Sequence, residues 1–165
     1  MCIRDSIISP SGGLGVITAD ACESSGLQVA KLREETLNQF RKASPPFIDV
    51  GNPYDIWPSV SLIGMDEAYR IAVESMFEDK NVDAIIAGFM VTKGFTELKD
   101  NSFIAAASRK HPEKPIVVFA TSEWEMVDRM QADLEKQSVP VYISPEMAVE
   151  SLATMYKYSV VRASL

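Results

Sequence analysis

The sequence predicts an α/β domain in which helices cover both faces of a five-stranded parallel sheet, giving three layers. Apolar runs of strand length alternate with runs of helical period from one end of the 165 residues to the other. Strands buried on both faces read as continuous apolar runs, as Ile85–Val91 does. A chain of this length, with 47% hydrophobic and 24% charged residues, fills one globular domain. We therefore expect one compact, doubly wound unit.

Five strands are expected, and in chain order they are Ile3–Ser9, Leu27–Leu32, Val82–Phe89, Pro115–Ala120 and Val139–Ser144. The helical patterns between them are Gly13–Ser25, Glu34–Ala43, Asp66–Asp79, Phe95–Lys110, Ser122–Lys136 and Pro145–Tyr158. Several helices have explicit ends: Gly26 follows the first, Thr121 or Ser122 can cap the fifth, and Pro145 can open the last. Five strands connected in this way are typical of a flavodoxin-like fold.

Residues Ser44–Gly64 break this rhythm, because four prolines and two glycines interrupt them. A long loop is predicted here, and its aromatic and aliphatic content favours docking over disorder. In a doubly wound sheet the ligand crevice lies beyond the carboxyl ends of the strands. The side chains predicted to line that crevice are Asn52, Asp55, Phe89, Met90 and Thr121.

The charge balance excludes several kinds of partner. With a formal net charge of -7, and no basic cluster longer than Arg109-Lys110, the chain lacks the basic face that nucleic acid or an anionic membrane requires. Two cysteines, no CxxC pair and a single histidine give no zinc motif, so we predict no metal site and a reducing compartment. No apolar run approaches the ~20 residues that span a bilayer. Without a signal-peptide pattern either, we predict a cytoplasmic protein.

The most informative motif is the turn Ser9-Pro10-Ser11-Gly12-Gly13-Leu14-Gly15, between the first strand and the first helix. A glycine-rich turn at a helix start directs backbone N–H groups at one point, and the helix dipole adds about half a positive charge there. The predicted phosphate-binding residues are Ser11, Gly12, Gly13, Leu14 and Gly15. The alternative is purely steric: small residues let the first helix pack closely on the sheet.

Other interpretations of the turn fit less well. A dinucleotide fingerprint would need glycine in place of Thr18 and a carboxylate at the end of the second strand, which closes on Lys31-Leu32. A nucleophile elbow would need glycine in place of Ser9, so Ser11 is a weak candidate nucleophile. A response-regulator receiver would need acidic residues after the first and third strands, where the chain has Ser9-Pro10 and Phe89-Met90.

No catalytic side chain is predicted in this chain. His111 lies in a polar turn at the amino end of the fourth strand, away from the crevice, so an exposed loop histidine is expected. Asp20 interrupts the apolar first helix, where it should face solvent or bond to backbone. Asp20 is therefore assigned a structural role.

A series of motifs along the chain resembles one known family. In order they are Ser11-Gly12-Gly13-Leu14-Gly15-Val16, Ala19-Asp20-Ala21, Gly26-Leu27, Glu35-Thr36, Pro45-Pro46, Gly51-Asn52-Pro53-Tyr54-Asp55, Asn81-Val82-Asp83-Ala84, Lys114-Pro115-Ile116-Val117 and Ser144-Pro145-Glu146-Met147-Ala148-Val149. With them the chain resembles the CoA-ligase domain of NDP-forming acyl-CoA synthetases such as ADP-forming acetate–CoA ligase, and is similar to the carboxyl-terminal domain of the succinyl-CoA synthetase beta subunit. The resemblance implies a CoA-ligase domain over 7–160, a non-native or truncated N-terminus over 1–6 and a tail over 161–165.

The resemblance also implies a reaction. In this family an acyl phosphate forms, a histidine takes up the phosphoryl group, CoA attacks the acyl phosphate, and the phosphohistidine exchanges phosphate with ADP. The flavodoxin-like domain supplies a helix whose N-terminus faces the phosphohistidine, and the match places that helix at Gly13. The parent enzyme would use CoA, ADP or ATP, and Mg²⁺, none of them held tightly by this domain.

The chain departs from the family by lacking the Ser-His-Thr-Gly type of segment that bears the histidine, and the CoA-binding and ATP-grasp domains. The resemblance therefore implies one domain of an oligomeric enzyme, inactive alone, whose partners are those two domains in the same chain or in another subunit. The alternative is a non-catalytic flavodoxin-like module that binds a small anion or nucleotide in the crevice, with Trp57 and Trp124 as apolar contacts.

Overall fold

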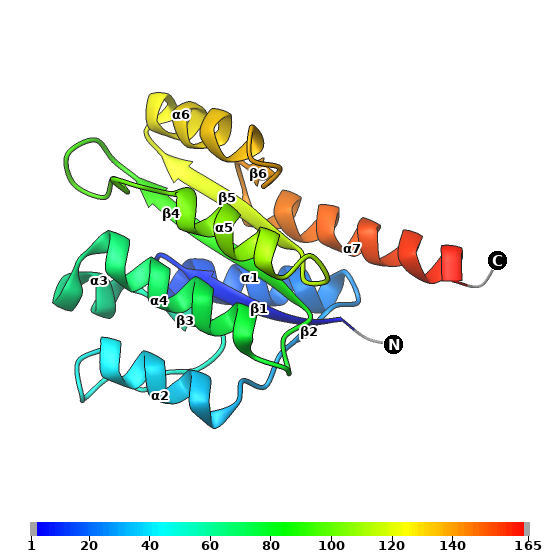
Figure 1. Ribbon diagram of the computed structural model, residues 1–165, viewed down its shortest axis with the longest axis horizontal. Coiled ribbons are helices and arrows are strands. Elements are labelled where there is room, and N and C mark those ends of the chain that lie inside the picture. The colour runs from blue at the N-terminus through cyan, green and yellow to red at the C-terminus, as the bar shows by residue number, and fades with distance from the viewer. Residues whose placement is uncertain (1–2, 164–165) are drawn as a thin grey trace.

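The computed structural model describes residues 3–163, which form a parallel sheet flanked by helices (Figure 1). The strands are β1 Arg4–Ser9, β2 Gln28–Val29, β3 Tyr54–Asp55, β4 Ala84–Val91, β5 Ile116–Ser122 and β6 Val141–Tyr142. The helices are α1 Gly12–Ser24, α2 Glu34–Ala43, α3 Trp57–Ile63, α4 Met65–Glu78, α5 Ser102–Lys110, α6 Trp124–Glu135 and α7 Pro145–Ala163. Residues 1–2 and 164–165, which belong to the predicted N-terminal and tail segments, lie outside the described residues.

Every strand pairing is parallel, and the strand order is β2-β1-β4-β5-β6 with β3 also paired to β1. Strand β2 pairs with the start of β1, at Arg4, and β3 pairs with its end, at Ile8. Since β4 covers the opposite edge of β1, the two short strands follow one another along the same edge. Six strands thus fill five positions, and the predicted flavodoxin-like α/β fold is confirmed.

Asn52 fills the gap between β2 and β3. Its Oδ1 accepts a hydrogen bond from the Ile7 amide at 2.8 Å, and its Nδ2 donates to the carbonyl oxygens of Asp5 and Ala30, both at 2.9 Å. The side-chain amide therefore gives the Ile7 amide the partner that the edge of β1 would otherwise lack, because buried backbone groups need partners. The Asp5 carbonyl oxygen also accepts from the Ala30 amide.

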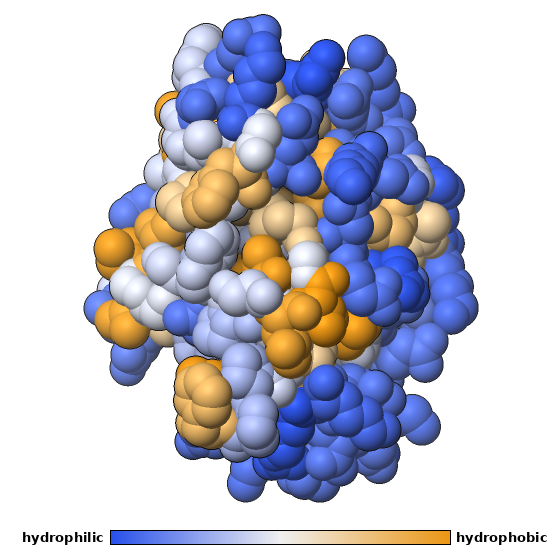
Figure 2. All heavy atoms as spheres, turned by 90° about the vertical axis from the view of Figure 1, so that its left-hand side faces the viewer, coloured by the Kyte–Doolittle hydropathy of each residue, from blue (hydrophilic) through white to orange (hydrophobic). Residues whose placement is uncertain are grey.

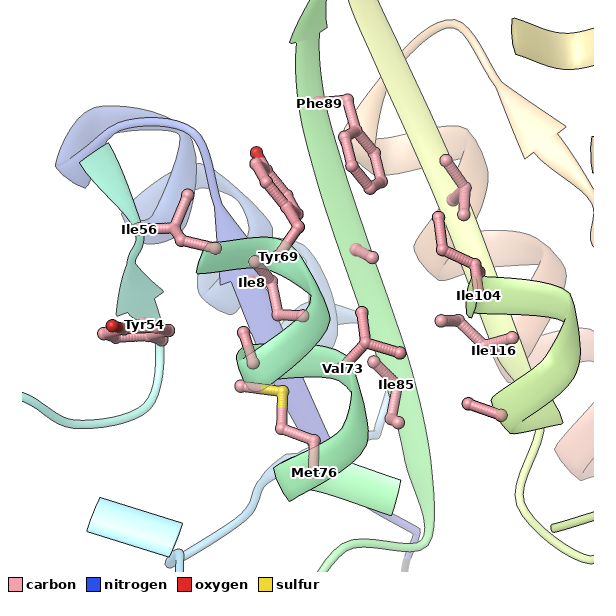
Figure 3. Packing of buried hydrophobic residues seen from close by; sticks show 14 of the residues in the cluster. Ile8, Tyr54, Ile56, Tyr69, Val73, Met76, Ile85, Phe89, Ile104 and Ile116 are labelled. Carbon is pink, nitrogen blue, oxygen red and sulfur yellow. The ribbon is translucent and has the colours of Figure 1, made fainter. Parts of the chain in front are cut away.

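Each face of the sheet has its own hydrophobic core. Helices α1 and α7 cover one face, where Ile7, Ile86 and Phe119 are buried. Helices α2, α4, α5 and α6 cover the other face, on which the larger core includes Ile8 and Tyr69 (Figure 3). A central strand such as β4, with seven buried residues out of eight, is apolar throughout because both its faces are covered.

The structure differs from the sequence prediction at several places. The predicted strands Leu27–Leu32 and Val139–Ser144 are reduced to the two-residue strands β2 and β6. The predicted loop over 44–64 contains β3 and the two-turn helix α3, whose Pro58 lies in the first turn, where proline is tolerated. Helix α5 begins at Ser102 instead of Phe95. The chain first makes a turn at Gly94, which has a φ of 70°, and the amides of Lys99 and Asp100 then bond to the Asp66 carboxylate instead of to a helix. Helix α7 runs to Ala163, beyond the predicted end at Tyr158, and the predicted tail over 161–165 stays a prediction.

Two buried polar side chains on β1 have no hydrogen-bond partner. Asp5 and Ser6 are both 0% exposed, and neither carboxylate oxygen of Asp5 nor the Ser6 hydroxyl is paired within the described residues. Burial raises the pKa of Asp5 to about 8, and the charge of Asp83 adds to this rise. These two residues fall in the segment predicted to be non-native, which remains a prediction.

Candidate functional site

The candidate site is the turn between β1 and α1, at the carboxyl edge of the sheet. Ser11 caps the helix: its Oγ accepts from the Leu14 amide at 3.3 Å, and its carbonyl oxygen accepts from the Gly15 amide at 3.0 Å. The buried Ser9 hydroxyl holds Ser11 in turn, donating to the Ser11 carbonyl oxygen at 2.6 Å. The amides of Leu14 and Gly15 are therefore already satisfied by the protein.

Two amides at the helix start remain open. Gly12 and Gly13 are exposed, and their N–H groups have no partner among residues 3–163. They lie at the positive end of a 13-residue helix, where an anion is stabilised by typically 0.3–1 kcal/mol, and by up to about 2 kcal/mol in partly buried sites. Of the five residues predicted to bind phosphate, Gly12 and Gly13 can offer a backbone N–H. Ser11 shapes the turn. Leu14 and Gly15 cannot donate to a ligand without breaking their hydrogen bonds to Ser11.

The segment Pro53–Asp55 packs against the first turn of α1. A Cβ on Gly12 would lie 3.3 Å from Asp55 Oδ2, and a Cβ on Gly15 would lie 3.2 Å from the Pro53 Cβ. Both distances are tighter than ordinary van der Waals contact, so glycine at these positions permits the close approach. The other oxygen of Asp55, Oδ1, accepts from the Trp57 amide at 3.1 Å. A carboxylate consequently lies beside the open amides.

The other residues predicted to line a crevice have different environments. Phe89 is fully buried and stacks on Tyr69 with ring centroids 4.3 Å apart, so its prediction as a crevice residue is wrong. Its position on β4 directs it into the core beneath α4, because alternate residues of a strand face opposite sides of the sheet. Met90 and Thr121 are partners in the β4–β5 ladder and are partly exposed. The polar atoms of Asn52 are used by backbone.

The same edge of the sheet has features that the sequence did not indicate. Ser122 has a φ of 102°, which is unusual for a residue with a side chain, and its Oγ lies 2.9 Å from Thr92 Oγ1 at the end of β4. The loop after β4 presents Phe95, which is 71% exposed and contacts Trp57 at 6.0 Å between ring centroids. Figure 2, viewed from this edge, shows apolar residues gathered at the centre of the face.

His111 and Asp20 take no part in this turn. His111 ends α5 at the opposite edge of the sheet, as predicted, but it is partly buried: its ring lies on Phe77 at 5.5 Å, and Nδ1 is 3.6 Å from Glu113. The expectation of an exposed loop histidine is therefore wrong, since the Phe77 ring covers one face of the imidazole. Asp20 faces solvent, which is one of the two positions predicted for it.

Two general features of the described residues bear on the site. No group of three or more histidine, cysteine, aspartate or glutamate side chains in 3–163 is arranged to hold a metal ion. No helix within that range is both long enough and apolar enough to cross a membrane.

Comparisons with known proteins identify the family. Residues 5–165 match the family model described as the Ligase-CoA domain. The chain is 30% identical over 156 residues to an ADP-forming acetate–CoA ligase II of Archaeoglobus fulgidus, covering 94% of this chain and 23% of that enzyme. It is 31% identical over 146 residues to the alpha subunit of ADP-forming acetate–CoA ligase II of Pyrococcus furiosus, covering 87% of this chain and 31% of that subunit.

A solved structure agrees with these sequence matches. The dinucleotide-forming acetyl-coenzyme A synthetase 1 of Ca. Korarchaeum cryptofilum, in complex with phosphate and ADP, superposes with a TM-score of 0.79 and 25% identity, covering 97% of this chain and 34% of that one. The chain thus spans a quarter to a third of the length of the relatives that it matches. From the match over 5–165 together with the shared fold, the chain belongs to the Ligase-CoA domain family.

Proposed function

We propose that this chain is one domain of an ADP-forming acyl-CoA synthetase of the acetate–CoA ligase type. In that enzyme the N-terminus of α1 stabilises a phosphoryl group while acyl-CoA, ADP and phosphate interconvert with the free acid, CoA and ATP. The relatives that support the proposal are ADP-forming acetate–CoA ligases, and this chain matches 23% and 31% of two of them. The domain is accordingly expected to be inactive alone.

The observation on which the proposal depends is the pair of open amides at Gly12 and Gly13. Backbone donors fixed by a helix need no reorganisation when negative charge develops in front of them, which is how preorganised dipoles lower a barrier. Ser11 and Ser9 hold the turn in place by bonds within the turn itself, so the two amides point outward from a rigid start of the helix. The domain can therefore contribute electrostatically without supplying a titrating side chain.

The remaining chemistry belongs to other parts of the proposed enzyme. A phosphohistidine, CoA, ADP or ATP, and Mg²⁺ would be held by the CoA-binding and ATP-grasp domains, in the same chain or in a separate subunit. Membership of an oligomer and a cytoplasmic location remain predictions from the sequence.

A pair of variants at Gly12 tests the proposal. Gly12→Pro removes one open N–H at the first helical position, where proline is well tolerated, and the preceding Ser11 already has the extended backbone that proline requires. Gly12→Ala adds a Cβ of the same kind beside Asp55 but keeps the N–H, so it is the matched control. The readout is the ¹⁵N–¹H amide spectrum during titration with inorganic phosphate.

In the parent chain, the Gly12 and Gly13 amide resonances should shift saturably, and that of Leu14 should shift less. The Gly13 response in Gly12→Pro should need about two- to twelvefold more phosphate for half-saturation than in Gly12→Ala, which corresponds to losing one hydrogen bond of about 0.5–1.5 kcal/mol. Equal half-saturation in the two variants, or no response in the parent chain, would contradict the proposal.

A further inference from the structure

A ring of three buried hydroxyl groups lies next to the segment that touches the glycine turn. The Tyr54 hydroxyl is 2.6 Å from Ser59 Oγ and 3.1 Å from Ser44 Oγ, and the two serine hydroxyls are 2.8 Å apart. All three residues are buried, with exposed fractions of 2%, 0% and 4% for Tyr54, Ser59 and Ser44. The ring ties together the end of α2, strand β3 and helix α3, which are the elements of the proline-rich segment.

Two sets of contacts hold the Tyr54 side chain: the other two hydroxyl groups hold its own hydroxyl, and Phe40 holds its aromatic ring. Each hydroxyl can donate one hydrogen bond and accept another, so three hydroxyls within bonding distance satisfy one another's donors without water. The aromatic ring of Tyr54 stacks on Phe40 with centroids 3.9 Å apart and an interplanar angle of 6°. Neither the hydroxyl nor the ring can move without loss of a buried contact.

The residues on either side of Tyr54 contact α1. Along a strand, successive side chains point to opposite faces, so Pro53 and Asp55 face away from the core that holds Tyr54. Pro53 approaches Gly15 and Asp55 approaches Gly12, the two glycines whose missing side chains make room for them. Through Pro53 and Asp55, the position of Tyr54 affects the first turn of α1 at two points. These are Gly12, the first residue of the helix, and Gly15, the fourth.

We propose that Tyr54 is a positioning residue for the open amides of α1: the hydroxyl ring holds Tyr54, and Tyr54 holds Pro53 and Asp55 against Gly15 and Gly12. The inference rests on the proposed function, because the amides it positions are those assigned to the phosphoryl group. If Tyr54 merely filled the core, removal of its hydroxyl would affect stability alone.

Tyr69 on α4 provides the matched control. It is also buried, its hydroxyl donates to the Gly88 carbonyl oxygen at 2.8 Å, and its ring stacks on Phe89. Figure 3 shows Tyr69 on α4 beside Phe89, and Tyr54 separately on β3. Tyr54→Phe and Tyr69→Phe each delete one buried hydroxyl, but only Tyr54 belongs to the segment that touches Gly12 and Gly15, while the Tyr69 hydroxyl bonds to Gly88 on β4.

The experiment compares amide spectra and phosphate titrations of the parent chain and both variants, together with their thermal midpoints. Tyr54→Phe should shift the Gly12 and Gly13 resonances before phosphate is added, and should raise the half-saturating phosphate concentration at least threefold. Tyr69→Phe should also lower the thermal midpoint but leave half-saturation within twofold of the parent. The inference is overturned if the two variants change the glycine resonances and the phosphate response equally, or if Tyr54→Phe changes neither.

The outcomes separate this inference from the proposed function. If the parent chain shows no phosphate response, the proposed anion contact fails, yet the shifts of Gly12, Gly13 and Gly15 without phosphate still decide whether Tyr54 positions the turn. If Tyr54→Phe does not fold, Ser59→Ala removes another corner of the ring and leaves the Ser44–Tyr54 bond. The same shifts in the glycine amides are then expected, with about twofold weaker phosphate binding, and unchanged amides would overturn the inference.

Discussion

The Asp55 carboxylate lies against Gly12, with Oδ2 3.3 Å from the point that a Cβ on Gly12 would occupy. A negative side chain at a helix N-terminus is stabilised by the helix dipole, and it therefore favours this start of α1 in the domain as it stands. The same charge opposes the approach of a second anion to the amides of Gly12 and Gly13. The site thus combines attraction by backbone donors with repulsion by one carboxylate.

Gly88 on β4 is predicted to be intolerant of any side chain. A Cβ there would lie 2.2 Å from the Cζ of Phe119, its direct partner on β5, so the aromatic ring covers the glycine. Gly88→Ala should destabilise the fold by about 1–3 kcal/mol in urea unfolding, because both strands are central and the Phe119 ring must move to make room. In a Phe119→Leu background the same substitution should cost clearly less. Equal costs in the two backgrounds would refute the explanation by steric overlap.

Lys114 is predicted to stabilise the end of helix α4. Its buried Nζ donates to the carbonyl oxygens of Met76, Phe77 and Asp79 at 3.2, 2.7 and 2.7 Å, at the end of the helix, where carbonyl groups lack intrahelical partners. The Met76 and Asp79 oxygens also accept backbone amides, whereas Lys114 is the only donor to Phe77 among residues 3–163. Lys114→Met should cost about 3 kcal/mol, since three charged hydrogen bonds are lost and the Phe77 carbonyl group loses its donor.

Lys110→Met is the control for this prediction. Lys110 pairs with Glu78 at 3.0 Å, but both side chains are mostly exposed, so its loss should cost no more than about 0.5 kcal/mol. If the two variants lose similar amounts of unfolding free energy, the hydrogen bonds made by Lys114 stabilise the domain no more than an exposed ion pair does.

Asp5 is predicted to make the stability of the domain depend on pH. Its pKa is raised to about 8 in the fold, from an ordinary value of 3.8, chiefly by burial. The folded state therefore holds a proton that the unfolded state releases, so this contribution is fully present below the unfolded pKa and is lost as the pH rises from about 4 through 8. Asp5→Val should be more stable than the parent by a few kcal/mol at about pH 9, where the buried carboxylate would be charged.

The difference between Asp5→Val and the parent should shrink steadily as the pH falls toward 4. Urea unfolding of both proteins across this range measures it, because other titrating groups cancel in the comparison. A difference that stays constant with pH would mean that Asp5 is ionised in the fold or not buried as described.

Much of the fold could be predicted from periodicity, because long elements have enough residues to display a pattern. The strands β1, β4 and β5 and the amphipathic helix α4 are examples. Strand β3 could not be predicted in this way: two residues have no measurable alternation, and Tyr54 becomes part of the sheet through its pairing with Ile8 and its bonds to Ser44 and Ser59. Its conformation is set by tertiary contacts.

The candidate site was predicted in place but not in detail. The glycine turn indicated a helix start with open amides, and Gly12 and Gly13 provide them. Leu14 does not provide an open amide, and the sequence contained a signal for this. A serine three residues before a helical position is a capping pattern, and its side chain accepts a hydrogen bond from the amide at that position. The error at Phe89 has a different cause. A strand buried on both faces gives no alternation from which to tell which side chains reach the edge.

Asp55 is predicted to select among anions at the start of α1, if the proposed function holds. An ionised carboxylate only accepts hydrogen bonds, and Asp55 Oδ2 has no donor among residues 3–163. An anion that still has a proton can therefore donate to Oδ2, whereas one without a proton is only repelled. At about pH 6 phosphate retains a proton and sulfate has none, so the Gly12 and Gly13 amides should respond to phosphate at about tenfold lower concentration than to sulfate. Asp55→Asn replaces the charge by an amide that can donate, and it should bind sulfate as tightly as phosphate.

Asp20→Asn is the control, because it makes the same change of charge on the exposed surface of α1, and it should retain the preference for phosphate. If Asp55→Asn keeps the parent's preference for phosphate, the carboxylate does not act on the ligand, and discrimination must come from the backbone amides alone.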